Sequence, residues 1–190
     1  MDLTNLINTW AFDFAKIIAS PWLNIIMKYI GESFLIVIPL VAIYLYFKKD
    51  KNVFSFSVLF FLLYFTSEII KLIVREKRPC NIPSLSWINN IGCESSFSFP
   101  SNHATVLSGL VLFTSSYKYL EILYTVWLIF VLFGRVYLGL HYFTDVVVGV
   151  LISFAIVWFI RKYYSKKINS KLSRIFCIIF RKLKICPKGW

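Results

Sequence analysis

Only two histidines occur among the 190 residues, and each lies in a short polar stretch of an otherwise apolar sequence. His103 closes the stretch Pro100-Ser101-Asn102-His103, and His141 lies between Arg135 and Asp145. Ionisable groups at membrane depth are energetically costly, so they are functional candidates by default. These two stretches are therefore the first candidates for a reaction centre.

The spacing of His141 and Asp145 is i, i+4, which predicts that both lie on one helix face. There the carboxylate would hold the proton of one imidazole nitrogen and leave a lone pair on the other. This arrangement activates nucleophiles and general bases. His103 is the only other side chain whose ordinary pKa suits it to give up a proton near neutrality, so it is the predicted proton donor.

Positive charge gathers before the first polar stretch. Lys71, Arg75 and Arg78 are spaced i, i+4, i+7, which predicts that a helix continuing to residue 78 lines them up on one face. Pro79 then favours an end to the helix. A helix end whose cations reach out to the membrane surface is the alternative, but it does not explain Lys71, two turns inside. Arginine and lysine suit phosphate oxygens, so this face predicts an anion site.

Ser101 is a good N-cap residue, so the helix that it opens would offer the backbone N–H groups of Asn102 and His103 to an anion. A capped helix with a solvated histidine beside it is the alternative for this motif alone. Together with Arg135, the basic residues, the helix N-terminus and the two histidines predict phosphoryl transfer. His141 attacks phosphorus, the cations stabilise the negative charge on the phosphoryl oxygens, and His103 protonates the leaving oxygen. Carboxylates are few here and no cluster has metal-ligand spacing, so neither a metal nor another cofactor is predicted.

The elements that must hold these residues are membrane helices. The chain is 58% hydrophobic and 16% charged, with mean hydropathy +0.71, which fits an all-α, polytopic integral-membrane bundle. Since a span takes roughly 20 apolar residues, clear candidates lie at about 33–47, 53–72, 119–137 and 144–161, with a shorter run at about 103–117. An amphipathic helix at 3–18 would either span the membrane or lie in its interface, which makes about six transmembrane helices.

The net charge of +12 would suggest a nucleic-acid partner in a soluble protein. Here the basic residues gather in the turn 48–51, at Lys118 and from Arg161 to Lys188, so no nucleic-acid partner is predicted. The positive-inside rule puts these segments in the cytoplasm and the loops 73–101 and 135–144 on the opposite face. The prediction is a multi-pass protein of the cell membrane whose site faces the extracytoplasmic side.

The chain divides into two parts. Residues 1–162 are predicted to form one membrane-embedded domain, since little chain remains for a second. Residues 163–190 alternate apolar with basic residues, which predicts a basic amphipathic segment on the inner leaflet, with a disordered cytoplasmic tail as the alternative. In the loop after Pro79, Cys80 and Cys93 either form a disulfide, which an oxidising compartment favours, or remain free thiols.

Three stretches, taken in order, resemble a known signature. They are Lys71-x6-Arg78-Pro79, Pro100-Ser101-Asn102-His103 and Arg135-x5-His141-x3-Asp145. They resemble the three-part signature of the type 2 phosphatidic acid phosphatase family of membrane lipid phosphatases. One motif alone is weak, but three in this order and spacing are specific. The resemblance covers about residues 68–146 and implies a six-helix layout with an extracytoplasmic site.

By position, the resemblance implies that His141 is the nucleophile that becomes phosphohistidine, Asp145 its partner, and His103 the general acid and then the base for water. It implies a phosphate clamp made of Lys71, Arg78, Ser101, Asn102 and Arg135. The chain departs from the family at Asn102 and Gly134, where Gly and Ser are usual. Asn102 keeps its backbone N–H for phosphate, while its side chain is expected to narrow the pocket. The role of Arg75, outside the signature, stays open.

The predicted function is a metal-independent membrane phosphatase that acts on a lipid phosphate or diphosphate. Polyprenyl diphosphate, phosphatidic acid and phosphatidylglycerol phosphate are the candidate substrate types, and the bilayer is the surrounding partner. One alternative is a phosphotransferase that passes the phosphoryl group to another lipid. Another is a non-catalytic lipid-phosphate binder or transporter, which would not need His103, His141 and Asp145 together.

Overall fold

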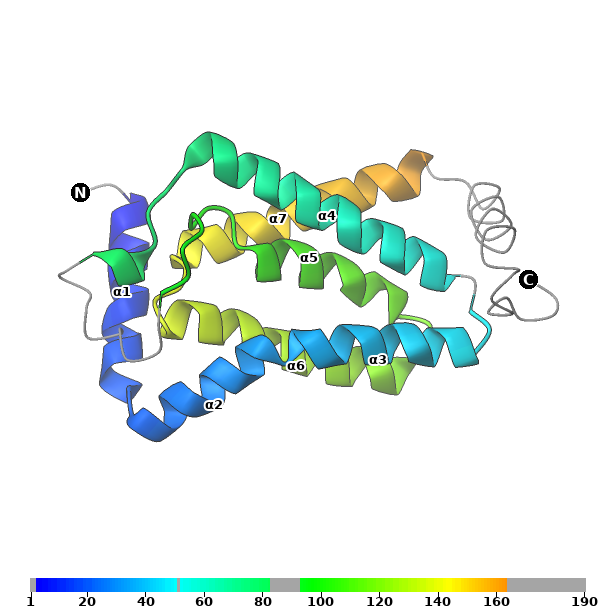
Figure 1. Cartoon of the computed structure of the whole chain (residues 1–190), viewed down its shortest axis with the longest axis horizontal. Helices are drawn as coiled ribbons and strands as arrows, with labels where there is room; N and C mark the ends of the chain where they lie inside the picture. The colour runs from blue at the N-terminus through cyan, green and yellow to red at the C-terminus, as the bar shows by residue number, and fades with distance from the viewer. Residues whose placement is uncertain (1–2, 51, 83–92, 164–190) are drawn as a thin grey trace.

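Helices make up the regular structure of the chain. The computed structural model describes residues 3–50, 52–82 and 93–163 (Figure 1), and no strand occurs among them. In chain order the helices are α1 (Leu3–Ile18), α2 (Pro21–Glu32), α3 (Phe34–Phe47), α4 (Asn52–Val74), α5 (Asn102–Leu110), α6 (Lys118–Tyr137) and α7 (Phe143–Tyr163). Two short 3-10 turns are η1 (Pro79–Asn81) and η3 (Val111–Phe113). The predicted all-α fold is confirmed.

Four described helical segments are long and apolar enough to cross a membrane: Pro21–Phe47, Asn52–Asn81, Lys118–Tyr137 and Phe143–Ile160. The apolar helix Asn102–Phe113 is shorter. Large apolar side chains lie exposed along the outside of the bundle, as Phe47, Ile73 and Trp158 do. A broad apolar surface of this kind suits contact with lipid. The predicted membrane bundle is therefore confirmed, with four candidate spans in the described residues and α5 as a shorter apolar helix.

α5 lies at the centre of the bundle, where α4, α6 and α7 pack around it (Figure 1). Every residue from Ala104 to Leu110 is buried. Leu107 packs in one apolar cluster with Leu63 of α4 and Val131 of α6. Because this short helix is enclosed by its neighbours, the residues at its N-terminal end are held at one end of the bundle.

α2 is not among the helices predicted from the sequence. The prediction began the second helix at about residue 33, whereas one helical segment runs from Pro21 to Phe47. Three polar residues interrupt the apolar pattern there, so hydropathy alone does not register it: Asn24, Lys28 and Glu32. Ser20 caps α2, since its hydroxyl accepts a hydrogen bond from Leu23 N at 3.2 Å. α2 packs along α6, and this contact brings the end of α2 to the polar end of the bundle.

The predicted continuation of the α4 helix to Arg78 is wrong. α4 ends at Val74, and Arg75 has a φ of 55°, in the left-handed region in which helices often end. Arg75 is exposed, and its Nε donates to Leu72 O at 2.9 Å. Arg78 has extended backbone, as expected before a proline. Lys71, Arg75 and Arg78 therefore do not share one helix face, and Arg75 points away from the other two.

α1 crosses the end of the bundle at a steep angle to the other helices (Figure 1). Asn8 fastens it to the start of α7: its side chain donates to Thr144 Oγ1 at 3.1 Å and accepts from Thr144 N at 3.2 Å. Trp10 and Ile17 of α1 are 71% and 81% exposed. An amphipathic helix in this orientation suits the membrane interface better than a span.

A glycine allows α5 and α7 to approach closely. A Cβ atom at Gly149 would lie 2.9 Å from the Cβ of Ala104 and 3.0 Å from the carbonyl oxygen of Ser101. At the same crossing, Ser101 N donates to the carbonyl oxygen of Asp145 at 3.2 Å. The glycine thus lets the first turns of the two helices lie side by side.

Gly149→Ala is expected to destabilise the protein. Overpacking of a tight contact costs about 1–3 kcal/mol, which outweighs the roughly 1 kcal/mol that alanine gains over glycine in a helix. Thermal unfolding in detergent should show a midpoint about 2–4 °C lower. Gly31→Ala is the matched control, because a Cβ there meets nothing closer than 3.8 Å. Equal midpoints for both variants would contradict the close α5–α7 contact.

Candidate active site

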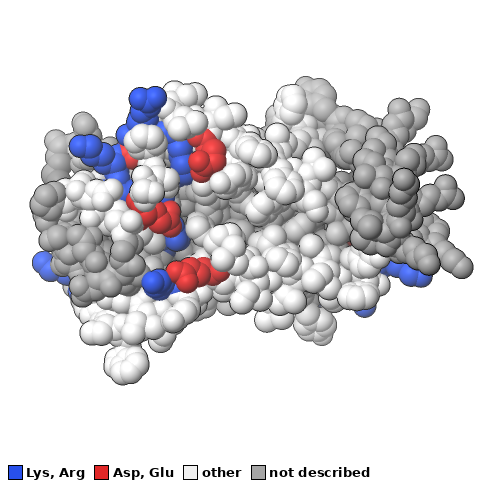
Figure 2. All heavy atoms as spheres, viewed as in Figure 1, with Lys and Arg blue, Asp and Glu red and all other residues white. Residues whose placement is uncertain are grey.

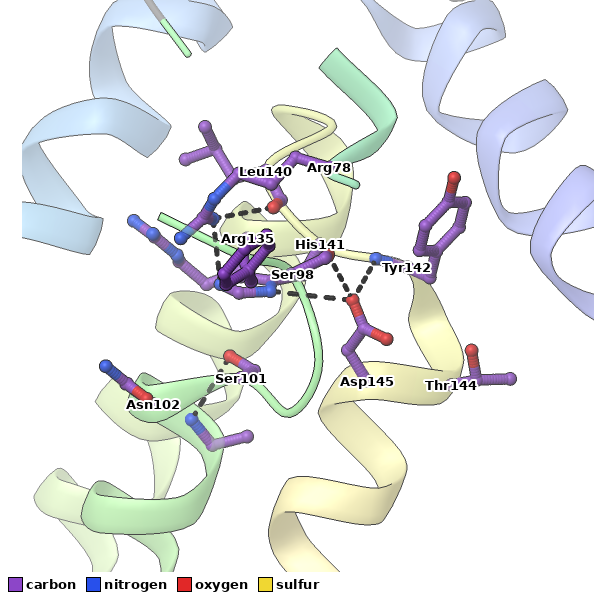
Figure 3. A network of polar contacts seen from close by, with 12 residues as sticks. Arg78, Ser98, Ser101, Asn102, Arg135, Leu140, His141, Tyr142, Thr144 and Asp145 are labelled. Atoms are coloured by element: carbon purple, nitrogen blue, oxygen red, sulfur yellow. Dashed lines mark hydrogen bonds and ion pairs between the residues drawn. The ribbon is translucent and has the colours of Figure 1, made fainter. Parts of the chain in front are cut away.

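The polar residues singled out in the sequence meet at the end of the bundle that α1 crosses. Figure 3 shows Arg78, Arg135, His141 and Asp145 gathered there. They come, in that order, from the segment after α4, the end of α6, the α6–α7 turn and the start of α7. In the view of Figure 2, charged side chains cluster at this end, while the middle of the bundle is uncharged. The polar cluster is thus set apart from the apolar body of the protein.

The turn between α6 and α7 places His141. Gly139 has a φ of 62°, a conformation that glycine adopts without a steric penalty. The turn folds back on α6, so that His141 N donates to Arg135 O at 3.2 Å. α7 begins only at Phe143. The predicted shared helix face for His141 and Asp145 is therefore wrong, because His141 precedes the helix.

His141 and Asp145 nevertheless face each other, and both are buried. Nδ1 of His141 lies 3.6 Å from Oδ2 of Asp145. The same oxygen accepts hydrogen bonds from Tyr142 N at 2.9 Å and from the Ser98 hydroxyl. These two bonds fix the carboxylate beside the imidazole. The predicted pairing of His141 with Asp145 is therefore present, although the two residues do not share a helix face.

The contact with Arg78 assigns the tautomer of His141. Nη1 of Arg78 lies 3.1 Å from Nε2 of His141. A guanidinium can only donate, so Nε2 is the unprotonated nitrogen and Nδ1 carries the proton that faces Asp145. Burial lowers the pKa of His141 well below its ordinary value, and the charges of Arg135, Arg78 and Lys71 lower it further. His141 is therefore neutral at pH 7, with its Nε2 lone pair directed at a cation.

His103 lies in the first turn of α5. Its ring packs edge-on against Phe34, with ring centroids 4.7 Å apart, and hydrogen-bonds the backbone of Gly31. Its Nε2 is buried and has no hydrogen-bond partner within the described part of the chain. The ring is also close enough to act electrostatically on His141. A buried imidazole nitrogen of this kind is costly unless a ligand pairs with it.

Arg78 is 2% exposed and is fixed by the loop and the turn around it. Its Nε donates to Ser96 O at 2.8 Å, and Nη1 donates to Leu140 O at 2.7 Å. Nη2 donates to the Ser96 hydroxyl at 2.7 Å and to Glu94 Oε2 at 2.6 Å. The guanidinium therefore keeps its orientation without a ligand, which is the property that preorganised electrostatic sites require.

Lys71 is also buried at the site, near the end of α4. Its Nζ donates to the carbonyl oxygens of Phe97 at 2.8 Å and Ser98 at 3.2 Å. Lys71 thereby fastens the loop segment whose Ser98 hydroxyl holds Asp145. The predicted residue is in place, and it anchors the loop as well as adding positive charge.

Ser101 caps α5 as predicted, since its hydroxyl accepts from Ala104 N at 3.5 Å. The side chain of Asn102 points away from His141 (Figure 3). It is bonded to α4, where its amide nitrogen donates to Glu68 and its oxygen accepts from Ser67. The expectation that this side chain narrows the pocket is therefore wrong. Only the backbone N–H of Asn102 is left for an anion.

Glu94 is a site residue that the sequence analysis missed. Its two carboxylate oxygens accept hydrogen bonds from Arg135 Nη2 and Arg78 Nη2, so one carboxylate bridges the two arginines. Arg135 itself is buried, and its Nε has no partner in the residues that the structure describes. Glu94 is the only acidic residue between Pro79 and Ser101, a signal that could have found it.

Cys80 and Cys93 form a disulfide, with their Cα atoms 5.8 Å apart. This outcome decides between the two alternatives that the sequence leaves open. Cys80 is buried, and its backbone N–H donates to Gly139 O at 3.0 Å. The bond therefore ties the loop at Glu94 to the turn that carries His141.

The cluster offers groups for attack and for charge stabilisation. A neutral imidazole lone pair lies among three buried cations. A second imidazole nitrogen, Nε2 of His103, has no hydrogen-bond partner among the described residues. Within residues 3–50, 52–82 and 93–163, no group of three or more His, Cys, Asp or Glu side chains could hold a metal ion. An anionic group with an electrophilic centre suits this arrangement.

Comparisons with known proteins agree with this geometry. The sequence profile of the PAP2 superfamily matches residues 52–169. An undecaprenyl-diphosphatase from Sulfolobus acidocaldarius is 28% identical over 118 residues, which cover 60% of this chain and 57% of that protein. The chain thus matches a little over half the length of this relative.

A solved structure is also similar over most of its length. It is the crystal structure of a transmembrane PAP2-type phosphatidylglycerolphosphate phosphatase from Bacillus subtilis. The TM-score is 0.66 and the sequence identity 26%, over 87% of this chain and 90% of that chain. With its apolar helices, the protein is therefore a multi-pass membrane protein. The matched stretch, residues 52–169, includes all three polar motifs, and the chain belongs to the PAP2 superfamily.

Proposed function

We propose that this protein is an integral-membrane phosphatase that hydrolyses a lipid phosphate or diphosphate through a phosphohistidine on His141. The observation that carries the proposal is the state of His141: a buried, neutral imidazole whose unprotonated Nε2 faces Arg78 at 3.1 Å. Phosphate oxygens bound among Arg78, Arg135 and Lys71 would bring phosphorus to that lone pair. Both similar proteins carry names of phosphatases that act on lipid phosphates or diphosphates.

In the first step, the Nε2 lone pair of His141 forms a bond to phosphorus, and the bond from phosphorus to the lipid oxygen breaks. The leaving oxygen takes a proton from His103, so a lipid alcohol leaves, or a lipid monophosphate when the substrate is a diphosphate. The negative charge of bound phosphate favours the protonated form of His103 that this step needs. Asp145 stabilises the positive charge on the His141 ring.

In the second step, His103 is neutral and takes a proton from a water molecule. The water oxygen bonds to phosphorus, the bond from phosphorus to Nε2 breaks, and inorganic phosphate leaves. Arg78, Arg135 and Lys71 offset the charge on the phosphoryl oxygens in both steps, assisted by the capped N-terminus of α5 at Ser101 and Asn102. No step needs a metal ion.

The same proposal includes an orientation. Lys48 and Lys49 lie in the turn after α3, and Lys118 is the first residue of α6; both places are at the end of the bundle remote from the site. The positive-inside rule supports placing that end in the cytoplasm of a cell membrane and the site on the extracytoplasmic side. Residues 1–162 would form the membrane domain. The predicted cytoplasmic tail, residues 163–190, lies outside the described residues apart from Tyr163 at its start.

Phosphate release from a panel of lipid phosphates tests the proposed function. The purified protein is expected to release inorganic phosphate from a polyprenyl diphosphate, phosphatidic acid or phosphatidylglycerol phosphate without an added acceptor lipid, and in the presence of EDTA. Release that requires an acceptor would point to a phosphotransferase. Release that EDTA abolishes and a metal ion restores would refute the metal-free mechanism.

A further inference from the structure

Glu94 occupies the position where the proposed function requires phosphate. Its carboxylate spans Arg78 and Arg135, the two guanidiniums assigned to the phosphate oxygens. Both arginine side chains are almost fully buried, whereas the Glu94 side chain is 44% exposed. The arginines are therefore fixed parts of the site, and Glu94 covers them from the outside.

Glu94 is held there as a charged group. Burial raises the pKa of its carboxyl, but the positive charges of Arg135, Arg78 and Lys71 outweigh that effect and hold the pKa below its ordinary value. An ionised carboxylate on two guanidiniums uses the same N–H donors as two phosphate oxygens would. The carboxylate and a phosphate cannot both occupy these donors, so a substrate has to displace Glu94.

We infer that Glu94 is a built-in competing anion: it occupies the two arginines until a multiply charged terminal phosphate or diphosphate displaces it, and a singly charged phosphodiester has no charge advantage over it. The inference rests on the proposed function, since it assigns the ligand of the same two arginines. The lipids around the site are the competing anions that matter most. The site lies at the surface of a bilayer, where the bulk phospholipid headgroups are phosphodiesters and outnumber the substrate.

The discrimination follows from charge. A phosphodiester carries one negative charge, as the Glu94 carboxylate does, so it gains no Coulombic advantage by replacing it. A phosphate monoester carries about −1.5 to −2 charges at pH 7, and a terminal diphosphate is also multiply charged. Only these ligands offer the arginines more negative charge than they already have. Glu94 thus raises the threshold for every anion, and the singly charged ones have no charge advantage over it.

The disulfide keeps this competitor at the site. Cys93 precedes Glu94 directly, and its bond to Cys80 joins the loop to a residue whose N–H is bonded to Gly139 in the α6–α7 turn. A carboxylate tethered this closely has a high effective concentration at the arginines. After displacement by a substrate, it stays within reach and returns when the product leaves.

Kinetics of Glu94→Gln test the inference. Hydrolysis of phosphatidic acid is measured in detergent micelles with increasing phosphatidylglycerol as the phosphodiester competitor. In the variant, the KM for phosphatidic acid should fall about tenfold, with a much smaller change in kcat. The inhibition constant of phosphatidylglycerol should fall by a similar factor, because removing a competitor strengthens the binding of every anion that uses the same donors. Glu121→Gln, which removes the same charge at the far end of α6, should change neither constant.

Other results would overturn the inference. A large loss of kcat would make Glu94 a catalytic residue, and a raised KM would make it a structural support for the arginines. An unchanged KM together with an unchanged inhibition constant would mean that Glu94 does not compete for the arginines. Glu94→Ala is the second variant if Glu94→Gln unfolds, as judged by its thermal midpoint.

The proposed function can fail separately. If the wild-type protein releases no phosphate from any lipid, the phosphatase assignment is wrong. Binding of inorganic phosphate and phosphatidylglycerol to wild type and Glu94→Gln, followed by intrinsic tryptophan fluorescence, then decides the inference alone. Tighter binding of both anions to the variant, by a similar factor, supports it. Equal affinities in the two proteins refute it.

Discussion

His141→Ala is expected to lower kcat for lipid phosphate hydrolysis about 10⁴-fold or more, because the change removes the atom that forms the bond to phosphorus. Arg78, Arg135 and His103 stay, so substrate affinity should change much less than turnover. The measurement is phosphate release from the best substrate of the lipid panel. Inhibition by vanadate, a mimic of the five-coordinate transition state, should characterise the wild-type reaction.

His141→Gln is the matched control that separates loss of the nucleophile from loss of stability. His141 is buried against Arg78, so alanine also leaves a small cavity and an unpaired guanidinium hydrogen. His141→Gln keeps an acceptor for Arg78 but provides no nucleophile. It should unfold at nearly the wild-type temperature and be as inactive as His141→Ala. Substantial turnover by the folded glutamine variant would remove His141 as the nucleophile.

Asp145→Asn is expected to lower kcat about 10²- to 10⁴-fold with a small change in KM, since the carboxylate orients the nucleophile and does not touch the substrate. The asparagine oxygen can still accept from Tyr142 N, so the start of α7 should remain intact. What is lost is the negative charge beside Nδ1 of His141. The imidazole then no longer has a fixed tautomer or a partner for the positive charge that it gains on attack.

A second substitution controls for loss of charge alone. Asp13→Asn removes a carboxylate from an exposed position on α1, and its kcat should equal that of the wild-type protein. If Asp145→Asn raised KM and left kcat unchanged, Asp145 would act on substrate binding. Its assignment as the partner of the nucleophile would then be wrong.

The fold class was predictable because it depends on composition and on the length of apolar runs. Composition and the length of apolar runs are enough to predict a span such as α7, whose apolar residues are nearly continuous. They do not register α2, because Asn24, Lys28 and Glu32 break its pattern and its stability comes from packing on α6. Tertiary contacts of this kind have no local signature in the chain.

The site was predictable as a set of residues and less so as a geometry. The chemistry of His141 and Asp145 requires only that they meet, so the prediction of their pairing holds although they do not share a helix. α4 ends at Val74 because Arg75 has left-handed backbone. No proline or glycine at that position signals this helix end in the sequence. Spacing alone therefore put Arg75 on one helix face with Lys71 and Arg78, which the backbone at Arg75 does not allow.

Side-chain directions set by tertiary partners were the least predictable. Asn102 turns from the pocket because Ser67 and Glu68 on α4 offer it hydrogen bonds. Glu94 reaches the arginines because a disulfide and a folded loop carry it there. Both contacts join residues distant in sequence, and a reading of local patterns cannot anticipate them.

Isolation of the covalent intermediate tests the central claim most directly. The wild-type protein is mixed with a lipid phosphate carrying ³²P in its terminal phosphate, quenched in alkali during turnover, and digested for mass spectrometry. The label should be found on the peptide that contains His141, as an acid-labile phosphohistidine, and should be absent from His141→Gln. Label on another residue, or rapid turnover without any labelled protein, would contradict a phosphohistidine at His141.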